Sequence, residues 1–248
     1  MAQIKLVLLA LTFYTRLPSP IALDYQDLGR ATIYFPVIGW LIGLLTALGF
    51  YGANLLWSQS TAVIIALMVG VLLTGALHED GVADVCDGFG GGYGKQRILE
   101  IMKDSHIGVY GVLGLVLLLM LKISVLTSFE ASQVPGLLFV GHSISRAMPL
   151  LLMQRYQYAR SSDSKAALAV YRPTSMELCF ALTCACLPFL VLPWVCLLAW
   201  LPVLAMNSYL GRYFQRHIEG YTGDCLGASQ QVAETLFYLT AQALWTFI

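Results

Sequence analysis

Charged residues are scarce in this chain, and their scarcity decides the class of protein. Only 11% of the 248 residues are Asp, Glu, Lys or Arg, whereas 58% are hydrophobic, and the mean hydropathy is +0.73. Soluble domains are about 25% charged and about 45–50% apolar. The composition therefore excludes an ordinary soluble domain and predicts an integral membrane protein.

The sequence also lacks a basic excess and paired cysteines. Its 14 basic and 14 acidic residues give a formal net charge of zero, whereas binding to a nucleic-acid backbone needs a basic surface. We therefore expect no nucleic-acid partner. Six cysteines are present but form no C-x-x-C pair, so zinc is not expected. Those in apolar runs are predicted to be buried free thiols: Cys179, Cys184, Cys186 and Cys196.

Long apolar runs recur along the whole chain. A helix needs about 20 apolar residues to cross a bilayer core of about 30 Å. We predict seven spans in one domain (1–248), at about 31–54, 61–77, 108–128, 134–153, 175–191, 194–211 and 231–248. Prolines 188, 193 and 202 are expected to interrupt the fifth and sixth. The run from Ile4 to Tyr14 is too short to span and predicts an interfacial or re-entrant helix, so the expected fold is an all-α, polytopic membrane helix bundle.

Basic residues lie on one side of these spans. If the N-terminus is cytoplasmic, the segments near Arg30, Lys95 and Arg212 are cytoplasmic too, and the loop 128–135 on the opposite side has no basic residue. This is the positive-inside pattern. Lys122 lies inside the third predicted span and is the exception, which we expect to snorkel outward. The polar segments are thus predicted to share the cytoplasmic face.

The densest charge lies in the polar segment 78–106. HEDGVADVCD places four carboxylates in positions 78–87. If the second span continues as a helix past Leu77, then Asp80, Asp84 and Asp87 lie within an arc of about 60°, and Glu79 points about 100° away from Asp80. Gly88 is the expected end of this helix.

A cluster of carboxylates this dense needs a cation to offset the repulsion between its charges. Two like charges 4 Å apart repel by roughly 4 kcal/mol at an effective dielectric of 20, and a helix C-terminus adds to the repulsion. All-oxygen ligands suit Mg²⁺, which leaves room for substrate phosphates. We predict Asp80, Asp84 and Asp87 as metal ligands, with Asp104 returning across the following loop. The alternative is a solvated acidic loop end or a set of helix caps.

Other polar groups are candidates for contacts with an anionic substrate. The glycine-rich segment GFGGGYG (88–94) either lets a ligand approach the backbone closely or forms a plain turn. The next segment, KQRILEIMKDS (95–105), predicts an amphipathic helix with Arg97 and Lys103 available to bind anions. The segment 154–175 adds further basic residues, which topology alone also explains: Arg155, Arg160, Lys165 and Arg172.

Two more features lie near or inside the spans. Arg146, within the fourth, is a candidate phosphate or carboxylate partner, or else a snorkelling arginine. In GYTGDCLGA (220–228), Asp224 either caps a helix or faces the pocket of the aspartates together with Thr222. Glu234, inside the last predicted span, would be a costly intramembrane acid.

Taken together, HEDGVADVCDGFGGG, RILEIMKDSHIGVYG and GYTGDCLGA resemble the cobalamin synthase family, adenosylcobinamide-GDP ribazoletransferase. The motifs occur in the family's order, TRLP (15–18) and FPVIG (35–39) resemble its N-terminal region, and the resemblance covers essentially the whole chain. It implies a multi-pass enzyme of the bacterial inner membrane, with cytoplasmic active-site loops, that uses Mg²⁺. The implied reaction joins adenosylcobinamide-GDP with alpha-ribazole or its phosphate and releases GMP. The implied partners are these substrates and the lipid bilayer, and a homo-oligomer is left open.

The resemblance also implies roles for individual residues. The family's acidic motif falls on Asp80, Asp84 and Asp87, its second motif on Lys103, Asp104 and Ser105, and its last on Thr222, Gly223 and Asp224. We predict Asp84, Asp87 and Asp104 as the catalytic residues. The attacking hydroxyl needs a general base, for which we predict Asp104, and we expect Arg97, Lys103 and Arg146 to neutralise phosphates. The chain departs from the family at Glu79, where an apolar residue is common, and at Glu219, where glycine is common. Neither departure affects the aspartates.

Two other functions fit parts of the pattern. A CDP-alcohol phosphotransferase of phospholipid synthesis also places aspartates in a D-x-x-D pattern, as Asp84 and Asp87 do, but DGFGG stands where that class has Ala-Arg after the glycine. A cation transporter needs its acids near the bilayer midplane between broken helices, whereas these acids are predicted at the cytoplasmic exit of a span.

Overall fold

The computed structural model describes residues 2–160 and 170–246, and Lys165 lies outside them. The described residues form helices and no strand; one isolated bridge pairs Tyr158 with Tyr221. This confirms the predicted all-α class. The α-helices are α1 (Ala2–Tyr14), α2 (Leu28–Ala31), α3 (Phe35–Asn54), α4 (Gln59–Thr74), α5 (Leu77–Gly91), α6 (Lys95–Ile101), α7 (Val109–Thr127), α8 (Val134–Arg155), α9 (Ser175–Cys186), α10 (Trp200–Ile218) and α11 (Gly223–Trp245). Short 3-10 helices occupy η1 (Tyr25–Asp27), η2 (Thr32–Tyr34), η4 (Leu187–Val191) and η5 (Trp194–Ala199).

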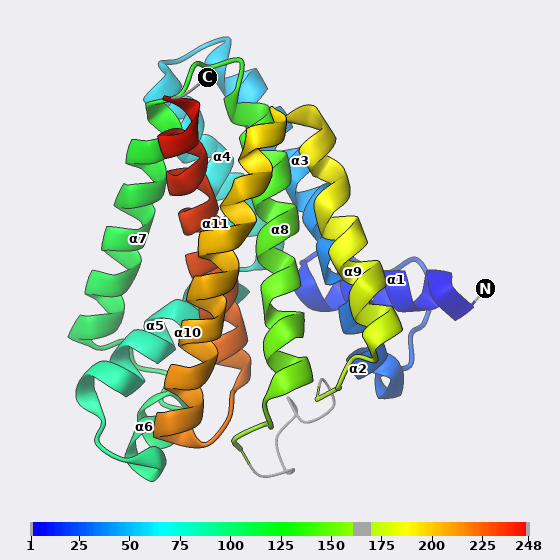
Figure 1. Cartoon of the computed structure of the whole chain (residues 1–248), viewed down its shortest axis with the longest axis vertical. Coiled ribbons are helices and arrows are strands. Elements are labelled where there is room, and N and C mark those ends of the chain that lie inside the picture. The colour runs from blue at the N-terminus through cyan, green and yellow to red at the C-terminus, as the bar shows by residue number, and fades with distance from the viewer. Residues whose placement is uncertain (1, 161–169, 247–248) are drawn as a thin grey trace.

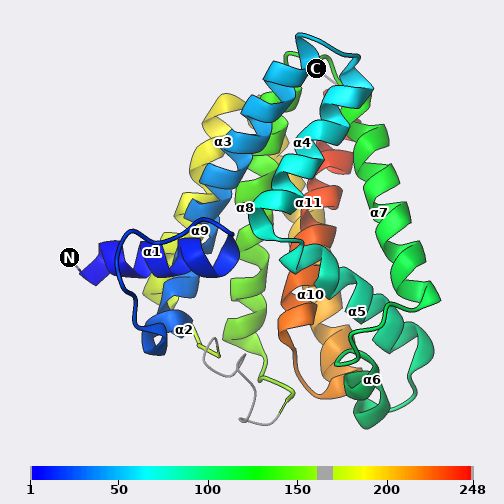
Figure 2. The same cartoon turned by 180° about the vertical axis from the view of Figure 1, so that it is seen from behind.

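Most of the helices run side by side along the long axis of the molecule (Figures 1 and 2). Helix α8 lies at the centre, is buried over most of its length and packs mainly on α3 and α11. Helix α1 lies crosswise at one side of the bundle, with the N-terminus pointing away from it (Figures 1 and 2). The short N-terminal run is therefore a separate helix, and its predicted interfacial or re-entrant position stays a prediction.

Four stretches are long and apolar enough to cross a membrane: Tyr25–Asn54, Val109–Thr127, Val134–Arg155 and Trp194–Ile218. A fifth is gained if the bent pair α4 and α5 counts as one span. The described part of the chain thus supports a membrane protein, but the predicted count of seven spans is not confirmed. Helix α9 has only 12 residues, and α11 carries buried polar residues, among them Gln230, Gln231 and Glu234.

The second predicted span does not continue as one helix. Gly75, with a φ of +66°, ends α4 in the left-handed conformation that glycine adopts freely. Ala76 follows with a φ of +60°, and α5 turns away from α4 by 91° (Figure 2). The acidic run is therefore a helix of its own and is not among the four long apolar stretches.

Two expectations about the ends of this helix need correction. Helix α5 runs through Gly88 and ends at Gly91, so Gly88 is not its end. Glu79 and Asp80 lie in its first turn, where the positive end of the helix dipole favours an anion. The acids therefore begin at a helix N-terminus rather than gathering at a C-terminus.

The fifth and sixth predicted spans are interrupted at two of the three expected prolines. Pro188 lies in η4 and Pro193 precedes η5, so tight 3-10 turns separate α9 from α10. Pro202 lies in the first turn of α10 and does not interrupt that helix. All six cysteines are free. Cys184 and Cys196 are buried as predicted, but Cys179 and Cys186 are exposed, because they lie on the outer face of the short helix α9.

Candidate active site

The polar segments that are separate in the sequence meet at one end of the bundle. The amide N–H of Tyr221 donates to the carbonyl oxygen of Gln157 at 2.9 Å. The Arg160 guanidinium donates to the Asp224 carboxylate at 2.8 Å and to the carbonyl oxygen of Met102 at 3.3 Å. Residues after α8, before α11 and after α6 are thereby held together, at the end where α5 and α6 lie (Figure 1).

Close packing of α5 on α11 brings their acids together. A Cβ on Gly81 would lie 2.8 Å from the carbonyl oxygen of Asp224, so only glycine allows this approach. The Thr222 hydroxyl caps α11 by accepting from the amide of Cys225. Asp224 consequently lies in the first turn of α11, beside the N-terminal half of α5.

The electrostatics of this end are dominated by three carboxylates. Burial and the nearby charges of Asp224 and Asp80 raise the pKa of Asp84 to about 7. Burial also raises the pKa of Asp224, and the adjacent Arg160 guanidinium opposes that rise. Asp80 is exposed. Acids that repel one another in this way form a site that a cation would stabilise.

Asp87 makes a structural contact that was not predicted. Its carboxylate accepts from the amides of Gly108 at 2.7 Å and Gly111 at 2.8 Å and is buried. These amides belong to the start of α7, so Asp87 anchors that helix N-terminus. Each oxygen accepts one of these bonds, so Asp87 is held at the start of α7, and its predicted role as a metal ligand and catalytic residue stays a prediction.

Asp104 lies apart from the other acids, in an exposed turn after α6. Its carboxylate contacts the ring Nδ1 of His106 at 2.7 Å and the backbone amide of that residue at 3.0 Å. Hydrogen bonding to His106 lowers the pKa of Asp104. Asp104 borders an open depression of about 360 Å³ that also contains Asp87 and Arg97.

The remaining predicted residues of the second and third motifs are exposed. Lys103 and Ser105 are exposed in the same turn as Asp104, and Arg97 pairs with Glu100 on the surface at 3.2 Å. Gly223, the first residue of α11, is exposed, and a Cβ added to it would meet no atom within 4 Å. Packing therefore does not require glycine at 223, which leaves the helix N-terminus open to a ligand.

The predicted metal set is not assembled as four aspartates. Over residues 2–160 and 170–246 there is no group of three or more His, Cys, Asp or Glu side chains already arranged around a metal position. Asp80 and Asp84 lie beside Asp224, and the charge of Asp87 also acts on Asp84, whereas Asp104 borders the depression near Arg97 that Asp87 also lines.

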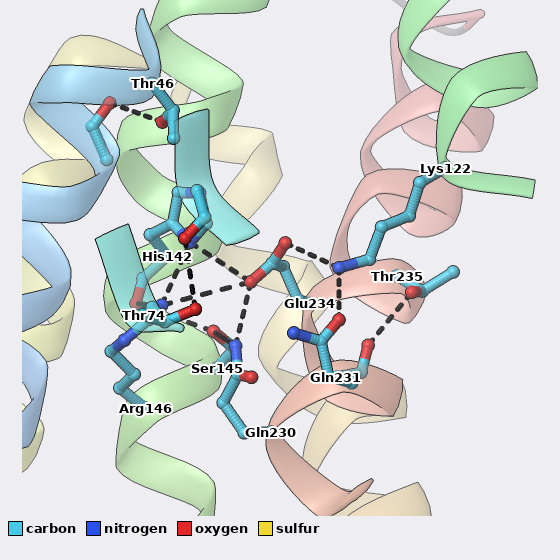
Figure 3. A network of polar contacts seen from close by, with 12 residues as sticks. Thr46, Thr74, Lys122, His142, Ser145, Arg146, Gln230, Gln231, Glu234 and Thr235 are labelled. Atoms are coloured by element: carbon cyan, nitrogen blue, oxygen red, sulfur yellow. Dashed lines mark hydrogen bonds and ion pairs between the residues drawn. The ribbon is translucent and has the colours of Figure 1, made fainter. Parts of the chain in front are cut away.

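A second polar cluster lies inside the bundle (Figure 3). The Lys122 ammonium donates to Glu234 at 2.7 Å and to Gln231 at 2.6 Å. Glu234 also lies 3.2 Å from the ring of His142 and 3.9 Å from the Arg146 guanidinium. The expectation that Lys122 snorkels outward is wrong, because its ammonium turns inward to the buried Glu234 carboxylate. Each of these two buried charges therefore has the other as its partner.

Two other residues belong to this intramembrane network. Arg146 is buried and donates to the carbonyl oxygen of His142 at 3.0 Å, so the carboxylate beside it is Glu234 rather than an aspartate of α5. Glu79 accepts from Gln231 at 2.8 Å. Glu79 thus faces the network while Asp80 faces the other way, as the helical spacing predicts.

A cavity of about 220 Å³ borders the acidic end and was not predicted. Its lining includes Asp80 and Asp224 together with the aromatic rings of Tyr14, Phe35 and Tyr221. These residues come from four segments far apart in the sequence, and no local spacing connects them. The sequence held one signal for this cavity, namely two motifs next to its aromatic residues. TRLP follows Tyr14 directly, and FPVIG begins at Phe35.

Comparison with known proteins identifies the family of this chain. The family model of Cobalamin-5-phosphate synthase matches residues 6–242. The chain belongs to this family. A relative from Shewanella amazonensis, "Adenosylcobinamide-GDP ribazoletransferase", is 42% identical over 98% of this chain and 97% of its own length. Proteins of the same name from Shewanella frigidimarina and Leptospira interrogans are 37% and 39% identical, over 98% and 95% of this chain and 95% and 94% of their own lengths.

No solved structure matches the chain. The family match and the relatives confirm the resemblance drawn from the three motifs. As a member of the Cobalamin-5-phosphate synthase family, the chain is a transferase of cobalamin biosynthesis that acts in assembly of the nucleotide loop. The match covers all three polar segments that meet at the acidic end.

Proposed function

We propose that the chain catalyses Mg²⁺-dependent transfer of adenosylcobinamide phosphate from adenosylcobinamide-GDP to alpha-ribazole or its phosphate. A ribose hydroxyl of the acceptor attacks the phosphorus bound to cobinamide, the pyrophosphate bond breaks, and GMP leaves. The products are adenosylcobalamin, or its phosphate, and GMP. The observation that carries the proposal is the meeting of Asp80, Asp84 and Asp224 beside Arg160 in a chain of this family.

The three carboxylates fit a magnesium ion by their chemistry. Their oxygens are hard ligands, and the raised pKa of Asp84 reflects a local excess of negative charge. Asp80 and Asp224 would hold the ion, because Mg²⁺ is commonly bound by one or two carboxylates together with substrate phosphates. When bound, the ion offsets the negative charge that develops on the bridging and leaving oxygens.

Asp84 is the proposed general base. It lies one helical turn from Asp80 on α5, and burial together with the charges of Asp224 and Asp80 raises its pKa to about 7 in the metal-free protein, which suits a group that must accept a proton near neutral pH. Asp104 was the predicted base, but its carboxylate is exposed and bound to His106. The lowered pKa of Asp104 makes it a weaker proton acceptor.

The donor phosphates would meet positive groups at the same end of the bundle. Arg160 lies beside Asp224, and the first amides of α11 begin at the open residue Gly223. Arg97 and Lys103 remain proposed contacts for the GMP portion, since both are exposed on the neighbouring α6 and its following turn. Arg146 is assigned to the intramembrane network instead.

The same geometry supports a proposed location for the acidic end. We propose that the acidic end faces the cytoplasm of a bacterium and that the apolar helices cross its inner membrane. The basic residues near the acidic end support this orientation through the positive-inside rule.

One assay tests the proposal. Purified protein in detergent is given adenosylcobinamide-GDP, alpha-ribazole and Mg²⁺, and the release of GMP is measured. We expect release that depends on both substrates and stops when the divalent ion is chelated. Release at an unchanged rate in chelator would overturn the metal assignment, and consumption of CDP-diacylglycerol instead would favour a phospholipid phosphotransferase.

A further inference from the structure

The cavity beside the acidic end is built from layered aromatic rings. The rings of Tyr14 and Phe35 stack with centroids 3.9 Å apart and an interplanar angle of 18°. Phe35 in turn lies 5.5 Å from the ring of His78 at 16°. On another part of the lining, Tyr158 meets Tyr221 edge to face at 5.7 Å. Flat, mostly apolar walls of this kind suit a planar aromatic guest.

His78 is a polar group within this aromatic layer that has no partner. Its side chain lines the cavity and is only 3% exposed. Among the described residues, no hydrogen-bond partner lies near either ring nitrogen. A buried polar group without a partner costs about 1–3 kcal/mol, and nearly all such groups are paired. An unpaired imidazole at a cavity wall therefore marks a hydrogen-bonding position for a ligand.

We propose that this cavity binds the heterocyclic base of the acceptor nucleoside, with His78 donating its N–H to the free ring nitrogen of a benzimidazole. The inference rests on the proposed function, which supplies the class of acceptor. With the base in the cavity, its ribose lies toward Asp80 and Asp224, which line the same space. The attacking hydroxyl is thereby placed beside the acidic cluster.

Size and polarity select this occupant over the other rings of the substrates. The volume of about 220 Å³ is below the roughly 300–1,000 Å³ of sites for drug-sized ligands, so a corrinoid does not fit. Guanine carries several donors and acceptors on its edges, each of which needs a partner when buried. A benzimidazole joined to ribose has one free ring nitrogen, which a single imidazole satisfies.

Replacement of His78 gives the first test. His78→Phe keeps a flat ring against Phe35 and removes both ring nitrogens. In the GMP-release assay we expect the KM for alpha-ribazole to rise at least tenfold while the KM for adenosylcobinamide-GDP stays unchanged. Because no described partner is lost, the melting temperature should stay the same or rise. The matched control is His217→Phe on exposed α10, which should change neither constant.

Direct binding gives the second test and needs no turnover. Free benzimidazole should bind the full chain in saturation-transfer NMR, and GMP should not displace it. Leu226→Phe, which adds a ring at the cavity lining, should abolish the signal. Absence of binding to the unaltered protein, displacement by GMP, or an unchanged KM for alpha-ribazole in His78→Phe would overturn the inference. Failure of GMP release by the unaltered protein would instead count against the proposed function, and the benzimidazole signal would still decide the cavity's occupant.

Discussion

At the scale of single residues, Asp84 couples the acidic site to pH. Its pKa of about 7 in the folded protein compares with about 3.9 for an unperturbed aspartate, so the folded state binds this proton more tightly than the unfolded state. The resulting stability is fully present below about pH 4 and is lost as the pH rises to about 7. Added charge at this position should therefore destabilise the metal-free protein.

We predict that metal-free protein melts at a lower temperature near pH 8 than near pH 5 and that Asp84→Asn reduces this difference. Mg²⁺ should restore stability near pH 8, where the carboxylates are charged. Thermal unfolding in detergent measures both effects. Asp27→Asn, at an exposed acid with no side-chain capping bond, is the control, and an equal loss of pH dependence in both variants would contradict the assignment.

Glu219 stores backbone strain next to the site. Its φ of +61° is left-handed, which costs a non-glycine residue about 1–2 kcal/mol, while its ion pair with Lys95 at 2.7 Å is exposed and worth about 0–1 kcal/mol. Glu219→Gly should therefore raise the melting temperature. Glu219→Ala removes the ion pair and keeps the strain, so it should be the less stable of the two, and the reverse order would contradict backbone strain at this position. A melting temperature of Glu219→Gly below that of the unaltered protein would show that the ion pair dominates.

At the scale of elements, the contact between α5 and α11 positions the acids. Gly81→Ala would force a Cβ against the Asp224 backbone, 2.8 Å away, and separate the two helices. Small displacements of reacting groups cost up to about a hundredfold in rate, so GMP release should fall by on the order of tenfold to a hundredfold.

The control for this substitution is Gly52→Ala on α3, where a Cβ meets no atom within 4 Å. Alanine favours a helix over glycine by about 1 kcal/mol, so this variant should be slightly more stable and fully active. Equal activity of the two variants would show that close packing at Gly81 does not position the site.

The intramembrane network joins α7, α8 and α11 through buried charges (Figure 3). Glu234→Gln leaves Lys122 charged and without its carboxylate, which should cost about 3–5 kcal/mol. Lys122→Met combined with Glu234→Gln should cost less than Glu234→Gln alone. Unfolding of the unaltered protein, of both single variants, including Lys122→Met, and of the double variant in detergent measures the coupling, and strictly additive losses would show that the pair is not a unit.

At the scale of the whole molecule, composition and spacing predicted the helical class, a separate short N-terminal helix and the shared face of Asp80 and Asp84. These features depend on local pattern alone. The 91° turn at Gly75 and Ala76 was not predicted, because an isolated glycine between apolar and acidic runs also fits a continuous helix.

Contacts across the chain were harder to predict. Lys122 and Glu234 are 112 positions apart, and Arg160 reaches Asp224 across 64. Sequence spacing contains no information on such pairs, so Lys122 was expected at the surface and Arg160 was explained by topology. The aromatic cavity depends in the same way on Tyr14, His78 and Tyr221 meeting in the folded bundle.

The central claim is that transfer takes place where α5 meets the N-terminus of α11. Its most direct test is the rate of GMP release from adenosylcobinamide-GDP and alpha-ribazole, at saturating Mg²⁺, by Asp84→Asn and by Asp104→Asn. Loss of a general base costs about 10²–10⁴-fold, so we predict a loss of that order for Asp84→Asn and a rate within a few-fold of the unaltered protein for Asp104→Asn. A near-normal rate for Asp84→Asn together with an inactive Asp104→Asn would contradict the account and place the chemistry at the depression beside Arg97.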